Sequence, residues 1–163
     1  MASRAPAQAA AASTTLHPST GDLVISWAAP DDHGSPVTAY SIEVRDQLGT
    51  AWSAAAACDG SEAAVVAALE CSIPMLTLTT APYSYTLDSL IVVRVAAENA
   101  KGWGAVSAGN SAGATAKTLP GQLAAVTRGS STTPAQVAVE WAALTGASST
   151  GGLPTTSYHL EYD

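Results

Sequence analysis

The sequence predicts an all-β fold, an antiparallel β-sandwich. About seven short alternating segments of strand length are separated by turn-forming residues every ~8–12 positions, and no amphipathic helix of useful length interrupts them. The sequence also reads nearly the same twice, as VISWAAPDDHGSPVTAYSIEVRD around Trp27 and as VAVEWAALTGASSTGGLPTTSYHLEYD around Trp141. A repeat at a period of about 114 positions indicates one complete sandwich followed by the first part of a second.

Both copies contain the same parts in the same order. A Trp closes an alternating strand, a loop with Gly-x-Pro follows, and a Tyr four residues after that Pro opens the next strand. Tyr40 follows Trp27 in this way, and Tyr158 follows Trp141, where it opens a strand over 158–162. Each Trp has the inward parity of its strand, so we expect these four aromatic residues in hydrophobic cores rather than on sugar-stacking platforms.

The remaining strands of the first sandwich follow from apolar residues at every second position. Val95 lies on the inward face of a strand together with Ile91, Val93 and Ala97, and we place it in the core. Residues 1–20 contribute a tail and a first edge strand. The other expected strands cover 22–28, 37–45, 52–57, 90–97 and 103–116, with turns rich in Gly, Pro, Asn and Asp between them.

Two cysteines, Cys58 and Cys71, bound an insertion in which both secondary structures compete. The run EAAVVAALE after Ser61 suits one or two helical turns, whereas Val65–Val66 suits a strand, which we favour. We expect a disulfide between the cysteines, worth roughly 3 kcal/mol, with two buried free thiols as the alternative. A disulfide implies an oxidising, extracellular setting.

Two stretches resemble the fibronectin type III family. WAAPDDHGSPVTAYSIEV is similar to the region of its strands B and C, and VRVAAENAKGWGAVS to the region of its strands F and G. The resemblance implies an immunoglobulin-like (fibronectin type III) β-sandwich over residues 15–118, with the cysteine-bounded insertion. Residues 1–14 then form an Ala/Ser/Thr-rich N-terminal segment, and residues 119–163 form strands A, B and C of a second such domain.

The chain departs from the family at one position and in its length. Ile91 occupies the register in which the family places a Tyr, so this tyrosine corner is either missing or rebuilt from Tyr83 or Tyr85. The insertion makes the domain longer than the usual module. In this respect the chain resembles fibronectin-III-like repeats of large protist cell-surface or ciliary-surface proteins, which implies an extracellular or cell-surface location.

Charge and composition exclude several functions. A net charge of −7 argues against nucleic acid, and no apolar run approaches the ~20 residues of a membrane-spanning helix. The three histidines, His17, His33 and His159, lie in separate segments, and Asp31–Asp32 lack the spacing of a calcium loop. We therefore expect no catalytic residues, no cofactor and no metal.

The surface composition favours contacts with neighbours. Charged residues make up only 12% of the chain, so Ser, Thr, Gly and Ala dominate its surface, which suits packing or a coat of O-glycans. The segments 79–82 and 130–134 combine Ser or Thr with Pro, as O-glycosylated segments do. Trp103, at the start of a strand, is the aromatic residue that we expect at an interface.

These observations predict a non-catalytic structural or adhesive repeat, a spacer and packing unit of an extracellular fibrous protein. Its expected partners are neighbouring domains or chains of the same protein. The second sandwich would be completed by further chain, completed by strands from a neighbour, or left disordered, and we favour the first. An accessory domain of a secreted carbohydrate-active enzyme and a ligand-binding receptor ectodomain remain as alternatives.

Overall fold

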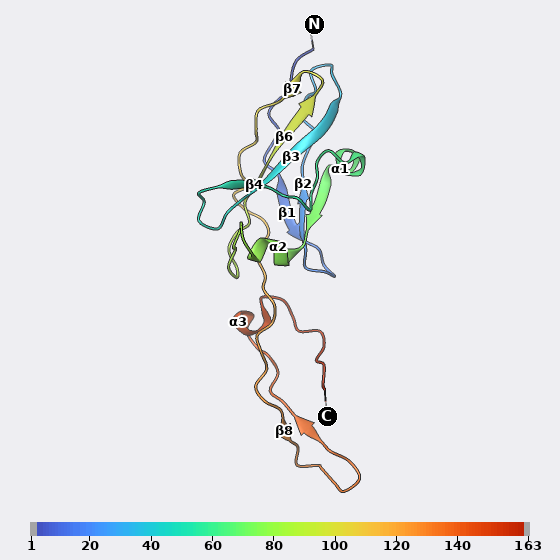
Figure 1. The fold of residues 1–163 in the computed structure, drawn as a ribbon, viewed down its shortest axis with the longest axis vertical. Coiled ribbons are helices and arrows are strands. Elements are labelled where there is room, and N and C mark those ends of the chain that lie inside the picture. The colour runs from blue at the N-terminus through green and yellow to red at the C-terminus, as the bar shows by residue number, and fades with distance from the viewer. Residues whose placement is uncertain (1–2, 162–163) are drawn as a thin grey trace. The chain divides into compact units, whose positions relative to one another are not determined.

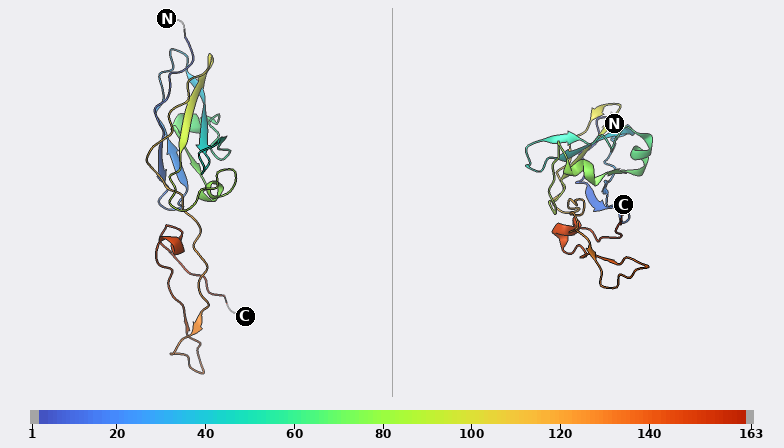
Figure 2. Two further views of the ribbon diagram at one scale, coloured as in Figure 1. Left: turned by 90° about the vertical axis from the view of Figure 1, so that its left-hand side faces the viewer. Right: turned by 60° about the horizontal axis from the view of Figure 1, so that its bottom comes forward.

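The computed structural model describes residues 3–161 and divides the chain into two compact units, Met1–Ala116 and Lys117–Asp163 (Figure 1). Unit 1 is a sandwich of two antiparallel sheets (Figure 2). The three-stranded sheet has the order β1 (Ser13–Leu16), β2 (Leu23–Ser26) and β5 (Glu70–Ile73). The four-stranded sheet has the order β4 (Trp52–Ala54), β3 (Val37–Arg45), β6 (Val93–Asn99) and β7 (Gly102–Trp103). The predicted fibronectin-III-like, all-β sandwich is confirmed.

The core of unit 1 follows from the alternation of β3 and β6. Ile42 and Val44 of β3 lie opposite Val95 and Val93 of β6, and these side chains are at most 3% exposed. Their neighbours in each strand face outward, as the period of two requires. Tyr40 belongs to the same inward row and is 4% exposed.

Trp27, directly after β2, joins this core from the other sheet. Its side chain is 7% exposed, and its indole lies 5.2 Å from the ring of Tyr40, centroid to centroid, at an interplanar angle of 59°. This tilted arrangement is the one that aromatic pairs prefer. The contact joins the two layers of the sandwich.

Two buried tyrosines occupy the space near the start of β6. The hydroxyl of Tyr83 donates to the carbonyl of Ala54 at 2.9 Å, and the hydroxyl of Tyr85 accepts from the amide of Val92 at 3.0 Å. Both side chains are 4% exposed. Tyr83 thus secures β4 and Tyr85 secures the entry into β6, but neither of these bonds is the one to backbone a few residues upstream that defines a tyrosine corner.

The N-terminal segment is part of unit 1. The amide of Ala7 donates to the carbonyl of Asp31 at 2.8 Å, and the side-chain amide of Gln8 donates to the carbonyl of Val106 at 2.7 Å. Ala9 and Ala12 are buried. The expected boundary after residue 14 does not appear, because β1 crosses it and small alanines let the preceding backbone lie against the sandwich.

The insertion contains a helix where we favoured a strand, so the prediction for Val65–Val66 is wrong. Both valines lie in α1 (Ala63–Ala68), which ends at Leu69 in a left-handed conformation. Val65, Val66 and Leu69 pack against the core from the helix. Four residues of β5 then supply the strand, and α2 (Met75–Thr79) follows, burying Leu78.

The last strand is shorter than the expected 103–116, since only β7 is regular. Beyond it, backbone and side chains together continue the contact with β6. The amide of Ser107 donates to the carbonyl of Val95 at 2.8 Å, and the amide of Val95 donates to the hydroxyl of Ser107 at 3.0 Å. The amide of Val93 donates to the side-chain carbonyl of Asn110 at 2.7 Å. The amide group of Asn110 also donates to the carbonyl of Ile91 at 3.0 Å. These bonds satisfy the edge of β6, which would otherwise be open to pairing with another chain.

Unit 2 contains a short ladder of β8 (Thr127–Arg128) with β9 (Val139–Glu140), and the one-turn helix α3 (Ala147–Thr150). Trp141 and Tyr158 make the same tilted contact as the pair in unit 1, with centroids 5.8 Å apart at 58°. They are nevertheless 42% and 39% exposed, so the predicted core around them does not form among the described residues.

No strand forms at the described residues of 158–161, and Tyr162 lies outside the described part of the chain. In unit 1 the corresponding strand, β3, is held by ladders to both β4 and β6. The described residues of unit 2 offer no such ladder partners, which explains why the predicted strand is missing there.

We expect the side-chain hydrogen bonds to the edge of β6 to contribute measurably to the free energy of unfolding. Asn110→Ala removes the acceptor of Val93 and one donor to Ile91, and should lower the free energy of unfolding by ~1–3 kcal/mol in urea titrations. Ser111→Ala, at an exposed neighbouring position, is the control and should change it by less than ~0.5 kcal/mol. Equal stability of the two variants would show that the bonds of Asn110 to β6 and Ile91 do not stabilise the fold.

Stability should also fall at alkaline pH. Burial raises the pKa of Tyr83 and that of Tyr85 above the usual value of about 10, so the fold favours the neutral phenols. Their contribution is complete below the pKa of the unfolded chain and is lost as the pH rises through the higher folded value. Urea titrations between pH ~8 and pH ~11.5 should show this loss, and Tyr83→Phe should reduce it. A flat profile would argue against burial of both phenols.

Candidate functional site: a groove on the four-stranded sheet

An open groove of about 530 Å³ lies on the outer face of the four-stranded sheet. Residues of β3, β6 and β7 line it together with the connecting segment 54–61. Trp103 of β7 is one of its lining residues and is 48% exposed, so we call this feature the Trp103 groove. Trp103, expected at an interface from the sequence, thus borders a concave surface.

The floor of the Trp103 groove is a row of side chains that crosses three strands. Ala39 of β3 lies opposite Glu98 of β6, and Glu98 lies opposite Trp103 of β7. Directly opposed residues of antiparallel strands point to the same face, with their Cβ atoms ~4.5–5.5 Å apart. The small side chains of Ala39 and the nearby Ser41 keep the floor low, while the indole rises at one end.

The segment 54–61 forms the other side of the groove because it runs along β3. The amide of Ala55 donates to the carbonyl of Ile42 at 3.2 Å, and the amide of Tyr40 donates to the carbonyl of Gly60 at 2.9 Å. A Cβ at Gly60 would collide with the carbonyl of Tyr40, so only glycine permits this approach.

A disulfide fixes this side of the groove. Cys58 lines the groove and is bonded to Cys71 of β5, with Cα atoms 5.4 Å apart. Cys71 pairs with Ile25 in the three-stranded sheet. The bond predicted from the sequence therefore connects the segment beside the four-stranded sheet to the opposite layer of the sandwich.

The groove is acidic. Asp59 accepts from the amide and the hydroxyl of Ser61 at 2.9 and 2.7 Å, and these bonds hold the pKa of its carboxyl below the usual value. Within residues 3–161, the carboxylate of Glu98 makes no hydrogen bond or ion pair with another side chain. No Lys or Arg lines the groove within that range.

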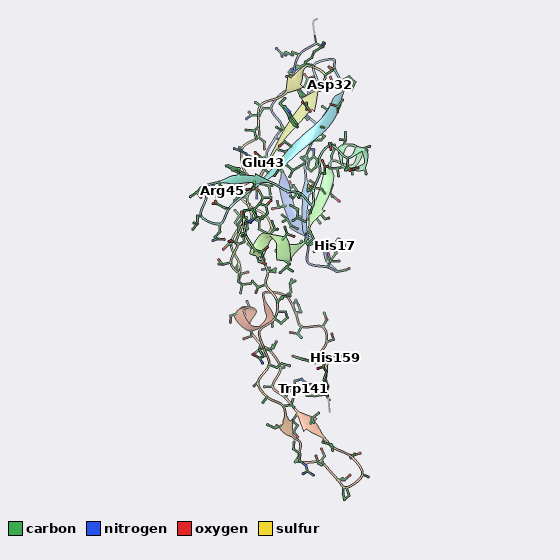
Figure 3. All side chains as sticks on the ribbon, in the orientation of Figure 1. His17, Asp32, Glu43, Arg45, Trp141 and His159 are labelled. Atoms are coloured by element: carbon green, nitrogen blue, oxygen red, sulfur yellow. A yellow bond between two sulfur atoms is a disulfide. The ribbon has the colours of Figure 1, made fainter. Side chains whose placement is uncertain are left out.

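At the opposite end of the same sheet face, another carboxylate and another indole already hold a cation. Arg94 of β6 donates to the carboxylate of Glu43 at 2.6 Å and lies 4.2 Å from the ring centroid of Trp52. Arg45 lies at 5.9 Å from the same ring; Figure 3 labels Glu43 and Arg45. A cation between a carboxylate and an indole thus already occurs on this sheet.

The histidines are not brought together. Figure 3 shows His17 and Asp32 toward opposite ends of unit 1, and His159 belongs to unit 2. His33 is engaged in structure, with Nδ1 2.8 Å from the carbonyl of Ala5 and Nε2 2.9 Å from the guanidinium of Arg4. Among residues 3–161, no group of three or more His, Cys, Asp or Glu residues could hold a metal ion.

Sequence reasoning missed Asp59 and Glu98 as site residues. The outward parity of Glu98 on its strand was a visible signal, but charged residues with that parity are usually solvated. Its position opposite Trp103 depends on the tight turn at residues 99–102 and on the pairing of β6 with β7. For Asp59, no pattern in the sequence indicated that its segment would run along β3.

Comparison with known proteins gave structural likenesses only. No family model and no curated protein matches the sequence. Solved structures that match include titin kinase with its flanking domains (18% identity, TM-score 0.47) and another set of titin domains (18%, 0.45). The FN1–FN3 domains of chicken CNTN1 also match (17%, 0.48).

These likenesses concern part of each molecule. They cover 69%, 66% and 76% of this chain, which spans only 17%, 31% and 37% of the three matched chains. The fold assignment rests on the strand order and register of unit 1. Within the described residues, no helix is both long enough and apolar enough to span a bilayer.

Loss of the disulfide should loosen the groove as well as the fold. Reduction, or Cys58→Ser with Cys71→Ser, should lower the free energy of unfolding by ~3 kcal/mol. Hydrogen exchange at the Tyr40 amide, which is bonded to Gly60, should speed up more than exchange at Val44 in the centre of the sheet. If the two amides respond equally, the disulfide does not specifically hold this side of the groove.

Proposed function

We propose that this chain is a non-catalytic structural and protein-interaction module, a spacer and packing unit of an extracellular or cell-surface fibrous protein. The half-exposed indole of Trp103, on a groove that a disulfide braces, carries this proposal. Large aromatic side chains on a rigid concave surface are typical of protein interfaces. Such a face would pack against neighbouring domains or chains of the same protein.

The groups that line the groove support binding rather than catalysis. Cys58 is oxidised, so it offers no thiolate nucleophile. The hydroxyl of Ser61 is bonded to the carboxylate of Asp59, and no described histidine lines the groove to act as a base. What remains is an aromatic face with carboxylates, which suits recognition.

The proposed location rests on the disulfide and on the surface. Disulfides persist in oxidising compartments, and a surface poor in charge suits contact with neighbours or a glycan coat. The Ser/Thr-Pro segments 79–82 and 130–134 are the proposed sites of O-glycans. A ciliary or flagellar surface is the finer proposal that the resemblance to protist repeats suggests.

The repeated aromatic pair supports a tandem arrangement. Trp141 and Tyr158 reproduce the interplanar angle of Trp27 and Tyr40 to within one degree, 58° against 59°. The second copy therefore shows the local geometry of the first without its burial. We propose that partner strands, from further chain or from a neighbour, cover this pair in the assembled protein.

A spacer that carries tension should unfold under force in a distinct step, and the disulfide should limit the length of chain released in that step. Cys58 and Cys71 are 13 positions apart, so the intact bond hides about 40 Å of the extended chain. In single-molecule pulling of a tandem array, unit 1 should lengthen by about 40 Å more after reduction. The double variant Cys58→Ser with Cys71→Ser is the control, and its step should not respond to reductant. An array that extends without a resolved unfolding force would rule out the spacer role.

A further inference from the structure

We propose that the Trp103 groove binds a Lys or Arg side chain of an extended polypeptide segment, which lies between the indole of Trp103 and the carboxylate of Glu98. The inference rests on the proposed function, since it specifies the chemistry of the partner at that site. It goes beyond packing in general by naming one charge and one pair of residues.

The filled cluster at the other end of the sheet shows the arrangement that this protein already uses. There the guanidinium of Arg94 lies 2.6 Å from the carboxylate of Glu43 and 4.2 Å from the ring centroid of Trp52. The cation gains from the negative face of the indole and from the opposite charge at the same time. The carboxylate of Glu43 and the indole of Trp52 thus hold the guanidinium of Arg94, and Arg45 lies 5.9 Å from the same ring centroid.

Glu98 and Trp103 repeat that pair without the cation. The two residues are directly opposed in the β6–β7 ladder and line the same groove. Glu98 is half-buried, and within residues 3–161 its carboxylate forms no ion pair, whereas the carboxylate of Glu43 pairs with Arg94. A carboxylate that is partly removed from water and unpaired favours the arrival of a positive group.

The remaining lining adds to the preference for a cation. Asp59, across the groove, carries a second carboxylate, kept ionised by its bonds to Ser61. No Lys or Arg of the described chain lines the groove to balance these charges. An anionic ligand would therefore be repelled, and a positive one attracted.

The shape of the groove favours an extended segment. Its floor consists of small side chains such as Ala39 and Ser41, so a backbone can approach closely. An extended chain directs alternate side chains to opposite sides, so one long side chain can enter while its neighbours point away. A volume of about 530 Å³ accommodates such a side chain with the backbone on either side of it.

The test uses the full chain and a peptide of defined sequence. Acetyl-Gly-Ser-Arg-Ser-Gly-amide is titrated into isotopically labelled protein, and the indole N–H of Trp103 and the amides of Glu98 and Ser61 are followed by NMR. We expect saturable shifts at these groups with a Kd of ~1 mM, and a Kd ~10-fold higher when Gln replaces Arg in the peptide. Binding should weaken as salt is raised.

Matched variants assign the effect to the pair. Glu98→Gln should raise the Kd about threefold, and Trp103→Ala should raise it about threefold through loss of the cation–π contact. Glu70→Gln removes the same charge from the exposed face of the three-stranded sheet, and it should leave the Kd unchanged. Glu98→Gln retains the shape of the side chain, so the test does not depend on the folding of Trp103→Ala.

Several outcomes would overturn the inference. Equal binding of the Arg and Gln peptides, or no response to Glu98→Gln, would show that the groove does not select a cation. Saturable shifts with chitotriose but not with the Arg peptide would assign the groove to carbohydrate instead. If unit 1 resists force as expected but the peptide does not bind, the spacer function stands and only the cation site fails.

Discussion

The contact between Trp27 and Tyr40 is the interaction on which the rest of unit 1 depends. It joins the two sheets across the core, with ring centroids 5.2 Å apart and both side chains almost fully buried. Because side chains alternate along a strand, an inward Tyr40 requires Ala39 and Ser41 to face outward. The packing of the core therefore also determines which residues form the floor of the Trp103 groove.

The segment 54–61, which forms one side of the groove, is also held in place by contacts with the core strands. Gly60 lies against the backbone of Tyr40, and Cys58 is bonded to β5 in the other sheet. A connection of this length would ordinarily be mobile, since loops have few buried contacts. Here a glycine and a disulfide keep it beside the sheet, so a surface feature gains the rigidity of the core.

The outer face of the four-stranded sheet carries two pairs of an indole and a carboxylate. At one end Arg94 lies between Trp52 and Glu43, and at the other end Trp103 and Glu98 have no cation from the described chain. The two ends differ in the residue that lies opposite the carboxylate, which is Arg94 for Glu43 and Ala39 for Glu98. One end therefore holds a cation of the chain itself, and the other end is the place where we propose that a partner supplies one.

Period and spacing alone determined the sandwich, the inward positions of Trp27, Tyr40 and Val95, and the pairing of the two cysteines. These features depend on neighbours in the sequence, or on the two cysteines the chain contains. Only the tertiary structure decided that Val65–Val66 are helical, that the side chains of Ser107 and Asn110 accept from amides at the edge of β6, and that Trp141 and Tyr158 stay exposed. The groove likewise brings together Glu98, Trp103 and Asp59 from separate segments. Strand register places Glu98 opposite Trp103, and the disulfide between the layers holds the segment of Asp59. No local pattern of residues encodes either of these long-range contacts.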